Sequence, residues 1–177
     1  MIVVLMGVSG SGKTTIGRML ADAIPCPFLE GDSLHPRANI EKMSRGIPLT
    51  DADRAPWLSA IHAHMVDVYN RGDSVVVGCS ALKQSYRTVL ADGLPLIWVY
   101  LRGSQDLIRS RILQRTSHFM KADLLASQFE ALEEPSDALV VDVSRSPDAI
   151  VKQILAELRG PAHADMAGSA DRRKGDA

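Results

Sequence analysis

Residues 1–14 read MIVVLMGVSGSGKT, and this stretch decides the fold. Its first half is a continuous apolar run, which is typical of a strand buried on both faces of a parallel sheet. Its second half, residues 7–14, matches the pattern G-x-x-x-x-G-K-[ST]. Glycines in this pattern adopt backbone angles closed to other residues, so that successive N–H groups converge on phosphate oxygens. The stretch therefore predicts a strand, a phosphate-binding loop and the N-terminus of a helix in direct succession.

The loop predicts a nucleoside triphosphate site in which single residues have separate tasks. Lys13 places an ammonium group beside the β- and γ-phosphates, and Thr14 offers its hydroxyl group to Mg²⁺. A glycine-rich turn that binds nothing would match the same pattern, but the strand before it and the helix after it favour a nucleotide site. We expect the nucleotide to be held by Gly7, Val8, Ser9, Gly10, Ser11, Gly12, Lys13, Thr14 and Thr15. The motif does not indicate what receives the phosphoryl group.

The rest of the chain alternates predicted strands and helices. We expect the strands at residues 1–6, 27–30, 74–77, 96–101 and 139–143. We expect the helices at residues 13–24, 51–71, 104–116 and 147–158, with Asp51 as the N-cap of the second. Such alternation is typical of βαβ units with right-handed crossovers around a parallel sheet. The sequence therefore predicts an α/β protein of the P-loop NTPase class, with three layers α/β/α and a five-stranded parallel sheet.

Length and composition bound the organisation of the chain. Its 177 residues, about 46% of them apolar, suit one compact domain, which we place at residues 1–159. Residues 160–177 are small, polar and charged, and we expect a disordered tail there. The 20 basic and 21 acidic residues give a formal net charge of −1, so electrostatics offers no case for nucleic acid as a partner.

The cellular location is also inferred from composition. No apolar run approaches the roughly 18 residues of a membrane span. The N-terminus lacks the charged region and the length of a signal peptide. The two cysteines, Cys26 and Cys79, are expected to be free thiols. We therefore expect a cytoplasmic protein that does not bind membranes.

Two carboxylates follow the second predicted strand, at Glu30 and Asp32. Ligands of doubly wound sheets lie beyond the carboxyl ends of the strands, so both should face the same crevice as the loop. We expect Asp32 to orient the attacking hydroxyl group and accept its proton, and Glu30 to hold a water molecule on Mg²⁺. The simpler alternative for Asp32 is a helix N-cap. His35 is a candidate substrate ligand, although a lone histidine is more often a packed or capping group.

Further candidates for the acceptor side come from two other segments. Arg54 carries the planar guanidinium group that suits a substrate carboxylate, with surface pairing to Asp51 or Asp53 as the alternative. Ser80 follows the third predicted strand and could hydrogen-bond substrate hydroxyl groups. Lys83 could meet an anionic group or lie on the first turn of a solvated helix. We keep both interpretations of each residue open at this point.

An arginine-rich helix predicts a lid. Arg111 and Arg115 are four residues apart and share a helix face, which suits the spread charge of a phosphoryl transition state. A surface helix with ordinary ion pairs is the alternative. We expect residues 111–125 to close over ATP and exclude water.

Several blocks of sequence, in order and at fitting spacing, carry a family resemblance. They are MGVSGSGKTT at 6–15, FLEGDSLHP at 28–36, GIPLTDADRAPWL at 46–58, CSALK at 79–83, SHFM at 117–120 and LLASQFEALEEP at 124–135. The chain resembles the small P-loop gluconokinases over roughly residues 1–158. It departs from their pattern at Ser117, where that family usually has glycine.

The resemblance implies an activity and its cofactors. It implies ATP-dependent phosphorylation of D-gluconate at the 6-hydroxyl group, giving 6-phosphogluconate. It also implies Mg²⁺, an adenylate-kinase-like fold with a helical lid and often a homodimer. It assigns the Glu30–Asp32 block and Arg54 to the acceptor side, and Arg111 and Arg115 to the lid.

Two other function classes stay open. A shikimate or nucleoside monophosphate kinase would share the loop, the acidic strand end and the lid. A monophosphate kinase needs cations for the acceptor phosphate, and a shikimate kinase is expected to have a glycine run where this chain has CSALK at 79–83. A nucleotide switch without a small-molecule acceptor is the third possibility, but the chain has no guanine-selective N-K-x-D signature.

Overall fold

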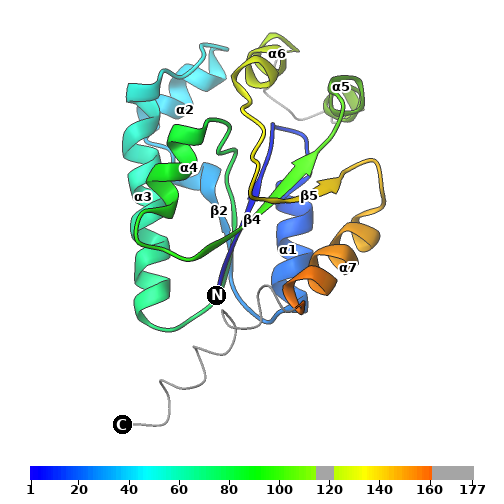
Figure 1. Cartoon of the computed structure of the whole chain (residues 1–177). Coiled ribbons are helices and arrows are strands. Elements are labelled where there is room, and N and C mark those ends of the chain that lie inside the picture. The colour runs from blue at the N-terminus through cyan, green and yellow to red at the C-terminus, as the bar shows by residue number, and fades with distance from the viewer. Residues whose placement is uncertain (115–121, 161–177) are drawn as a thin grey trace.

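The computed structural model describes residues 1–114 and 122–160. Its centre is a five-stranded parallel sheet in the order β2-β3-β1-β4-β5 (Figure 1). The strands are β1 Ile2–Met6, β2 Phe28–Glu30, β3 Val75–Gly78, β4 Leu96–Arg102 and β5 Leu139–Asp142. All five lie where the sequence predicted them, within a residue or so at each end. The α/β class and the five-stranded parallel sheet are therefore confirmed.

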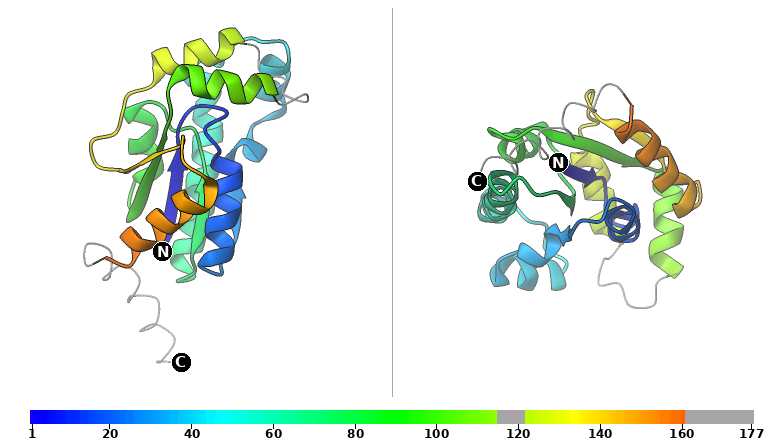
Figure 2. Two further views of the ribbon diagram at one scale, coloured as in Figure 1. Left: turned by 90° about the vertical axis from the view of Figure 1, so that its right-hand side faces the viewer. Right: turned by 90° about the horizontal axis from the view of Figure 1, so that it is seen from below.

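Helices cover both faces of the sheet. They are α1 Lys13–Ala23, α2 Arg37–Ser44, α3 Asp51–Asn70, α4 Gln84–Ala91, α5 Gln105–Gln114, α6 Ala122–Ala131 and α7 Pro147–Leu158, with a 3₁₀ turn η1 at Gly31–Leu34. Helices α1 and α7 pack on one face and α3 and α4 on the other (Figure 2). The four predicted helices are present. Helices α2, α4 and α6 were not predicted; they have 8, 8 and 10 residues, so an apolar spacing can repeat over three turns at most.

Strand β1 shows why its sequence is continuously apolar. Val3 and Leu5 point into the cluster formed with α1 and α7, whereas Ile2, Val4 and Met6 point into the cluster formed with α3 and α4. Every residue of the strand is at most 1% exposed. A strand in the middle of a sheet with helices on both faces has no solvent side, so both alternating sets of side chains must be apolar.

The start of α3 corrects one prediction. The N-cap is Thr50 and not Asp51: the Thr50 hydroxyl accepts a hydrogen bond from the Asp53 backbone N–H at 3.2 Å. The Asp53 carboxylate in turn accepts from the Thr50 backbone N–H at 2.9 Å. This reciprocal pair is a capping box, which satisfies two backbone donors that the first turn leaves free. Asp51 lies one residue inside the helix, and its carboxylate is free for other partners.

Composition also predicted free cysteines, no membrane-spanning helix and a C-terminal tail. Cys26 is half-buried, Cys79 is buried, and both are free thiols. Among the described residues, no helix has the length and apolarity needed to cross a lipid bilayer. The predicted tail lies almost entirely outside the described residues, which end at residue 160.

Candidate active site

The phosphate-binding loop joins the carboxyl end of β1 to α1. Gly7, Gly10 and Gly12 have φ angles of +139°, +81° and +103°, in the region that side chains with a Cβ rarely adopt. Two of them also lack room for a side chain. A Cβ on Gly7 would lie 2.9 Å from the carbonyl oxygen of Leu101, and one on Gly10 would lie 2.9 Å from Cγ1 of Ile112. The glycines are thus required by backbone angle and by packing, as a nest of converging amides demands.

Lys13 lies inside this loop. Its ammonium group donates to the carbonyl oxygens of Gly7 at 2.9 Å and Val8 at 3.1 Å, and the residue is only 7% exposed. Burial lowers the pKa of Lys13, while the nearby charges of Asp32 and Glu30 act in the opposite direction. A buried cation beside a loop of amides is a strong attractor for a polyanion.

The loop also contains a buried polar group. The hydroxyl oxygen of Ser11 is buried, and it has no hydrogen-bond partner within the described part of the chain. An unsatisfied buried hydroxyl group costs free energy unless a ligand or water pairs with it. The glycine backbone angles and the buried Lys13 ammonium group fit a bound nucleoside triphosphate.

The predicted metal-side residues lie together. The Thr14 hydroxyl group donates to Oε2 of Glu30 at 2.5 Å, so the start of α1 and the end of β2 meet at this point. Within the described residues, no group of three or more His, Cys, Asp or Glu side chains could hold a metal by itself. Mg²⁺ in phosphoryl-transfer sites commonly takes one or two protein oxygens, with phosphates and water completing its shell. Thr14 and Glu30 fit that chemistry.

The acidic block after β2 is fixed in position by its backbone. The indole N–H of Trp57 donates to the carbonyl oxygen of Gly31 at 2.7 Å. A Cβ on Gly31 would lie 2.5 Å from the carbonyl oxygen of Gly78, so the block approaches the end of β3 more closely than any other residue would allow. These two contacts place Asp32, which follows directly, at the carboxyl edge of the sheet.

Asp32 is exposed, and its charge acts on the phosphate-binding loop. Among nearby charges, it contributes most to raising the pKa of Lys13. The alternative role as a helix cap is not observed: α2 begins after Pro36 and has no side-chain cap, and Asp32 uses only its backbone carbonyl to accept from His35 N–H at 3.3 Å. The Asp32 carboxylate therefore remains available beside the phosphate-binding loop.

His35 packs against α3 through Trp57. Its ring stacks on Trp57 with centroids 4.2 Å apart, and Nδ1 lies 3.3 Å from Nδ2 of Asn39. Burial lowers the pKa of His35; the charge of Asp32 opposes this and that of Arg54 adds to it. The imidazole is thus packed and favoured in its neutral form. Its predicted contact with substrate stays a prediction.

Arg54 does not form the surface ion pairs that were the alternative to substrate binding. In the described residues, Asp51 pairs with Lys83 and Asp53 pairs with Lys42 at 2.6 Å, whereas neither pairs with Arg54. Nη1 of Arg54 instead donates to the carbonyl oxygen of Leu49 at 2.7 Å. These contacts fix one nitrogen of the guanidinium group at the rim of the acceptor side.

Tyr86 connects the two acceptor-side cations. Its hydroxyl group accepts from Nη1 of Arg54 at 3.3 Å and donates to the Asp51 carboxylate. Arg54 and Lys83 also lie 5.7 Å and 5.5 Å from the centroid of its ring. Nζ of Lys83 donates to both Asp51 oxygens at 2.9 Å, and this pairing raises the pKa of Lys83. Lys83 is therefore already paired, in contrast to Arg54.

The segment after β3 contacts the phosphate-binding loop through its backbone. The carbonyl oxygen of Ser80 accepts from the Gly7 N–H at 3.2 Å, so Ser80 lies next to the start of the loop. Its predicted hydrogen bond to substrate hydroxyl groups stays a prediction. Ala81 has a φ of +43°, which is unusual for a residue with a side chain. Arg87, to which the sequence assigned no role, is buried and donates to the Ala81 carbonyl at 3.0 Å. Burial raises the pKa of Cys79 to about 12, so its thiol is not a nucleophile.

Arg111 borders a cavity on the other side of the loop. Its Nη2 donates to the carbonyl oxygen of Val143 at 2.6 Å. The cavity has a volume of about 480 Å³, large enough for the nucleoside part of a nucleotide. It is lined by Gly10, Ser11, Gly12, Thr15, Ile16, Arg111, Gln114, Val143, Arg145, Pro147 and Ile150. Arg115 and residues 117–120 lie outside the described residues, so the shared face of the two lid arginines stays a prediction.

Sequence reasoning also missed Gln128 on α6. Its amide oxygen accepts from the backbone N–H of Ser9 at 2.7 Å, across 119 residues of chain. Gln128 lies in the block at 124–135 that carries the family resemblance, but the sequence assigned it no role. Its amide nitrogen also donates to Oγ of Ser9 at 3.3 Å, and the 119 residues between the two partners leave no local pairing pattern.

The sheet order, the buried lysine within a glycine loop and the adjacent carboxylates define a P-loop kinase. Over residues 2–137 the chain matches a family model described as an AAA domain. It is 43% identical to the thermoresistant gluconokinase of Escherichia coli strain K12 over 163 residues, which cover 89% of this chain and 93% of that protein. It is 46% identical to the gluconokinase of Gluconobacter oxydans strain 621H over 156 residues, 86% of this chain and 88% of that one. The chain therefore belongs to the gluconokinase family.

Solved structures agree with this assignment. The crystal structure of a gluconokinase from Sinorhizobium meliloti 1021 matches with a TM-score of 0.81 and 45% identity, covering 97% of this chain and 95% of that one. The shikimate kinase of Aquifex aeolicus matches with a TM-score of 0.59 at 17% identity, and this likeness shows the fold alone. The predicted resemblance and the kinase fold are thus confirmed.

Proposed function

We propose that this protein transfers the γ-phosphoryl group of ATP to the 6-hydroxyl group of D-gluconate, giving ADP and 6-phosphogluconate. The observation that carries the proposal is the 43–46% identity to gluconokinases over at least 86% of the chain. The matched length includes the acceptor-side segments as well as the phosphate-binding loop. The loop alone would support a nucleotide site without naming an acceptor.

On the donor side, the amides of residues 7–15 hold the triphosphate and Lys13 lies beside its β- and γ-phosphates. Thr14 and Glu30, already in contact at 2.5 Å, would hold Mg²⁺ or its water shell. When bound, Mg²⁺ neutralises charge on the phosphates. The cavity beside Arg111 accepts the nucleoside.

On the acceptor side, Asp32 orients the hydroxyl group and accepts its proton. The carboxylate is exposed at the sheet edge with no side-chain partner recorded among the described residues, so it can reach a substrate. Arg54 binds the gluconate carboxylate through Nη2 and Nε, since only Nη1 is used by Leu49 and Tyr86 in the described structure. Ser80 and His35 line the path between them. Lys83 contributes long-range charge more than direct contact, because Asp51 already holds its ammonium group.

We further propose that residues 111–125 act as the lid of a domain formed by residues 1–159, with Arg111 and Arg115 directed at the transferred group. The support is that Arg111 lines the cavity beside the phosphate-binding loop, and that the segment begins as a helix in α5. Deleting residues 160–177 should leave turnover unchanged. A loss of activity on that deletion would show that the tail belongs to the domain.

The deciding experiment offers several acceptors to the purified protein. ADP release is followed with ATP and Mg²⁺ in the presence of D-gluconate, other sugar acids, shikimate or nucleoside monophosphates. We expect turnover with gluconate. Turnover with another acceptor and none with gluconate would overturn the assignment and favour a shikimate-type or nucleoside monophosphate kinase. Nucleotide binding without any turnover would favour a switch protein.

We also propose that the protein acts as a homodimer in the cytoplasm. The support is the family resemblance and the two free thiols, which are usual in a reducing compartment. Light scattering of the purified protein tests the dimer. A mass near 19.2 kDa at all concentrations would contradict it.

A further inference from the structure

Helix α6 carries a glutamine that contacts the phosphate-binding loop through both atoms of its amide. The backbone N–H of Ser9 donates to Oε1 of Gln128 at 2.7 Å, and Nε2 of Gln128 donates to Oγ of Ser9 at 3.3 Å. A backbone N–H can only donate, so the atom that faces it must be the amide oxygen, and the orientation of the side chain is fixed. Nε2 has two hydrogens, and the Ser9 hydroxyl group uses one of them.

Ser9 lies at the end of the loop that faces the terminal phosphate. The ammonium group of Lys13 lies against the carbonyls of Gly7 and Val8, the two residues before Ser9. In phosphate-binding loops of this pattern the lysine serves the β- and γ-phosphates. The loop residues beside its ammonium group therefore lie at the γ end of the triphosphate, and Gln128 lies with them.

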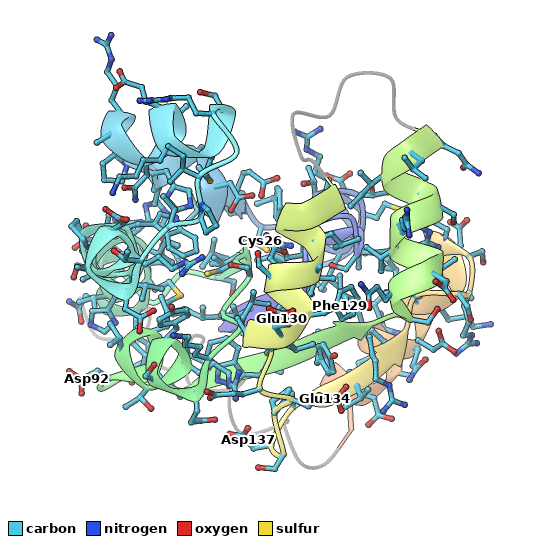
Figure 3. All side chains as sticks on the ribbon, turned by 90° about the horizontal axis from the view of Figure 1, so that it is seen from above. Cys26, Asp92, Phe129, Glu130, Glu134 and Asp137 are labelled. Carbon is cyan, nitrogen blue, oxygen red and sulfur yellow. The ribbon has the colours of Figure 1, made fainter. Side chains whose placement is uncertain are left out.

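Helix α6 is held firmly enough to aim a side chain. The backbone N–H of Glu133, just after the helix, donates to the carbonyl oxygen of Leu82 at 2.8 Å, and the Glu133 carboxylate accepts from the Gln84 N–H at 2.6 Å. Leu125, within the helix, is 2% exposed in the same apolar cluster as α1 and α5. Figure 3 shows α6 between α5 on one side and α2, α3 and α4 on the other, across the carboxyl edge of the sheet. The Gln128 amide is thus a positioned group.

A neutral amide is the chemistry that this position requires. The nearby positions Glu130, Glu133 and Glu134 all carry carboxylates. A carboxylate at position 128 would accept from the Ser9 N–H equally well, but it would repel a triphosphate in the loop. An amide accepts from the loop with its oxygen and can donate to an anion with its nitrogen, without adding charge.

We propose that Gln128 recognises the terminal phosphoryl group of the donor nucleotide. Its Oε1 holds α6 on the amide of Ser9, and its Nε2 donates a hydrogen bond to an oxygen of the γ-phosphoryl group. This inference rests on the proposed function, since it takes ATP as the phosphoryl donor. It assigns to α6 the task of distinguishing ATP from ADP before transfer begins.

Binding measurements test the proposal without relying on turnover. Calorimetry compares Mg²⁺·ADP with the Mg²⁺ complex of the non-hydrolysable imido analogue of ATP, for the wild type, Gln128→Ala and Gln128→Glu. Gln128→Ala should weaken the analogue about tenfold, the scale of a hydrogen bond to a charged group, and change ADP by less than about twofold. Gln128→Glu keeps an acceptor for Ser9 and should weaken the analogue more than alanine does. Gln105→Glu, the same substitution at an exposed position of α5, should change neither nucleotide.

Three outcomes would overturn the inference. Equal loss of affinity for both nucleotides in Gln128→Ala would show that the residue stabilises the loop and does not bind the γ-phosphoryl group. Unchanged affinity for both would remove Gln128 from the site. An analogue affinity in Gln128→Glu equal to that of the wild type would show that no charge reaches this position. Should Gln128→Ala fail to fold, Gln128→Glu still decides, because it retains the bond to Ser9.

The experiments distinguish a wrong acceptor assignment from a wrong role for Gln128. If the wild-type protein binds the analogue and yet fails to phosphorylate gluconate, the acceptor assignment is wrong while the ratio of analogue to ADP affinity still tests Gln128. If gluconate is a substrate, Gln128→Ala should lower kcat about tenfold and leave the gluconate KM within about twofold. A rise in the gluconate KM alone would place Gln128 on the acceptor side and overturn the inference.

Discussion

Replacing Arg54 by alanine tests the acceptor side most directly. In the described structure Nη1 of Arg54 is used by the Leu49 carbonyl at 2.7 Å and the Tyr86 hydroxyl at 3.3 Å. Nη2 and Nε form no hydrogen bond with the described residues, and we propose that they bind the carboxylate of the substrate. The substitution should therefore remove one charge-assisted contact to gluconate and one structural contact to Leu49.

The two losses have different sizes and appear in different measurements. A hydrogen bond between charged groups is worth about 1.5–3 kcal/mol, so the gluconate KM should rise roughly 10- to 150-fold. Losing the bond to Leu49 should lower the free energy of unfolding by about 1 kcal/mol, as measured by urea titration. The KM for ATP should change by less than about twofold, because the contacts of Arg54 among the described residues are with Leu49 and Tyr86 and not with the phosphate-binding loop.

Two controls separate charge from fold. Arg37→Ala removes an equally positive side chain from α2, where its only recorded contact in the described residues is the exposed pair with Glu41. Its kinetics should match the wild type. Arg54→Lys keeps the charge but loses the planar fork, so its gluconate KM should lie between those of the wild type and Arg54→Ala. Equal rises in both KM values of Arg54→Ala, or no rise for gluconate, would refute the carboxylate contact.

Three further predictions concern the base, the loop and the helix cap. Asp32→Asn should lower kcat at least ~100-fold, the usual contribution of a general base, with the KM for ATP unchanged; a full-speed variant would remove Asp32 from catalysis. Gly10→Ala should cost about 1–2 kcal/mol of unfolding free energy, because its φ is +81° and the new Cβ would meet Ile112, and chemical denaturation would measure this. The Asp53 carboxylate, whose pKa is lowered from 3.8 to about 2 chiefly by its hydrogen bond from Lys42, should stabilise the fold above pH 4 and lose that effect as the pH falls towards 2. Asp53→Asn should therefore flatten the acid limb of a stability–pH curve, and an unchanged limb would contradict the assignment.

The sheet could be predicted because its signals are local and redundant. Each strand is a short apolar run, and β1 is apolar at every position because helices cover both faces. The error at the start of α3 has a simple origin. Asp51, Asp53 and Thr50 are all good N-caps, and the T-x-x-D spacing that selects Thr50 is a weaker signal than the glutamate form of the capping box.

The nucleotide-binding residues could be predicted from the sequence, whereas several residues that contact them could not. Residues 7–14 match a motif whose every position has a backbone or charge requirement, and those requirements are seen in the φ angles and in the burial of Lys13. The sequence placed Thr14 and Glu30 at the same crevice, because ligands of such sheets lie beyond the carboxyl ends of the strands. Their direct hydrogen bond was not predicted, and strand β3 lies between β1 and β2 in the sheet.

Arg87 and Gln128, to which the sequence assigned no role, both bond to main-chain atoms, although Arg87 also bonds to Gln84 and Gln128 to the Ser9 hydroxyl group. Arg87 is buried and donates to the carbonyls of Ala81 and Leu82, and Gln128 accepts from the N–H of Ser9. Two side chains that pair with each other are complementary residue types, and both can be recognised in a sequence. A side chain that pairs with the backbone has no such partner, and residues of its type are also common on the surface. In a kinase the phosphate-binding loop is itself made of backbone donors. The side chains that hold such a loop in position are therefore hard to identify from the sequence, and the structure is needed to find them.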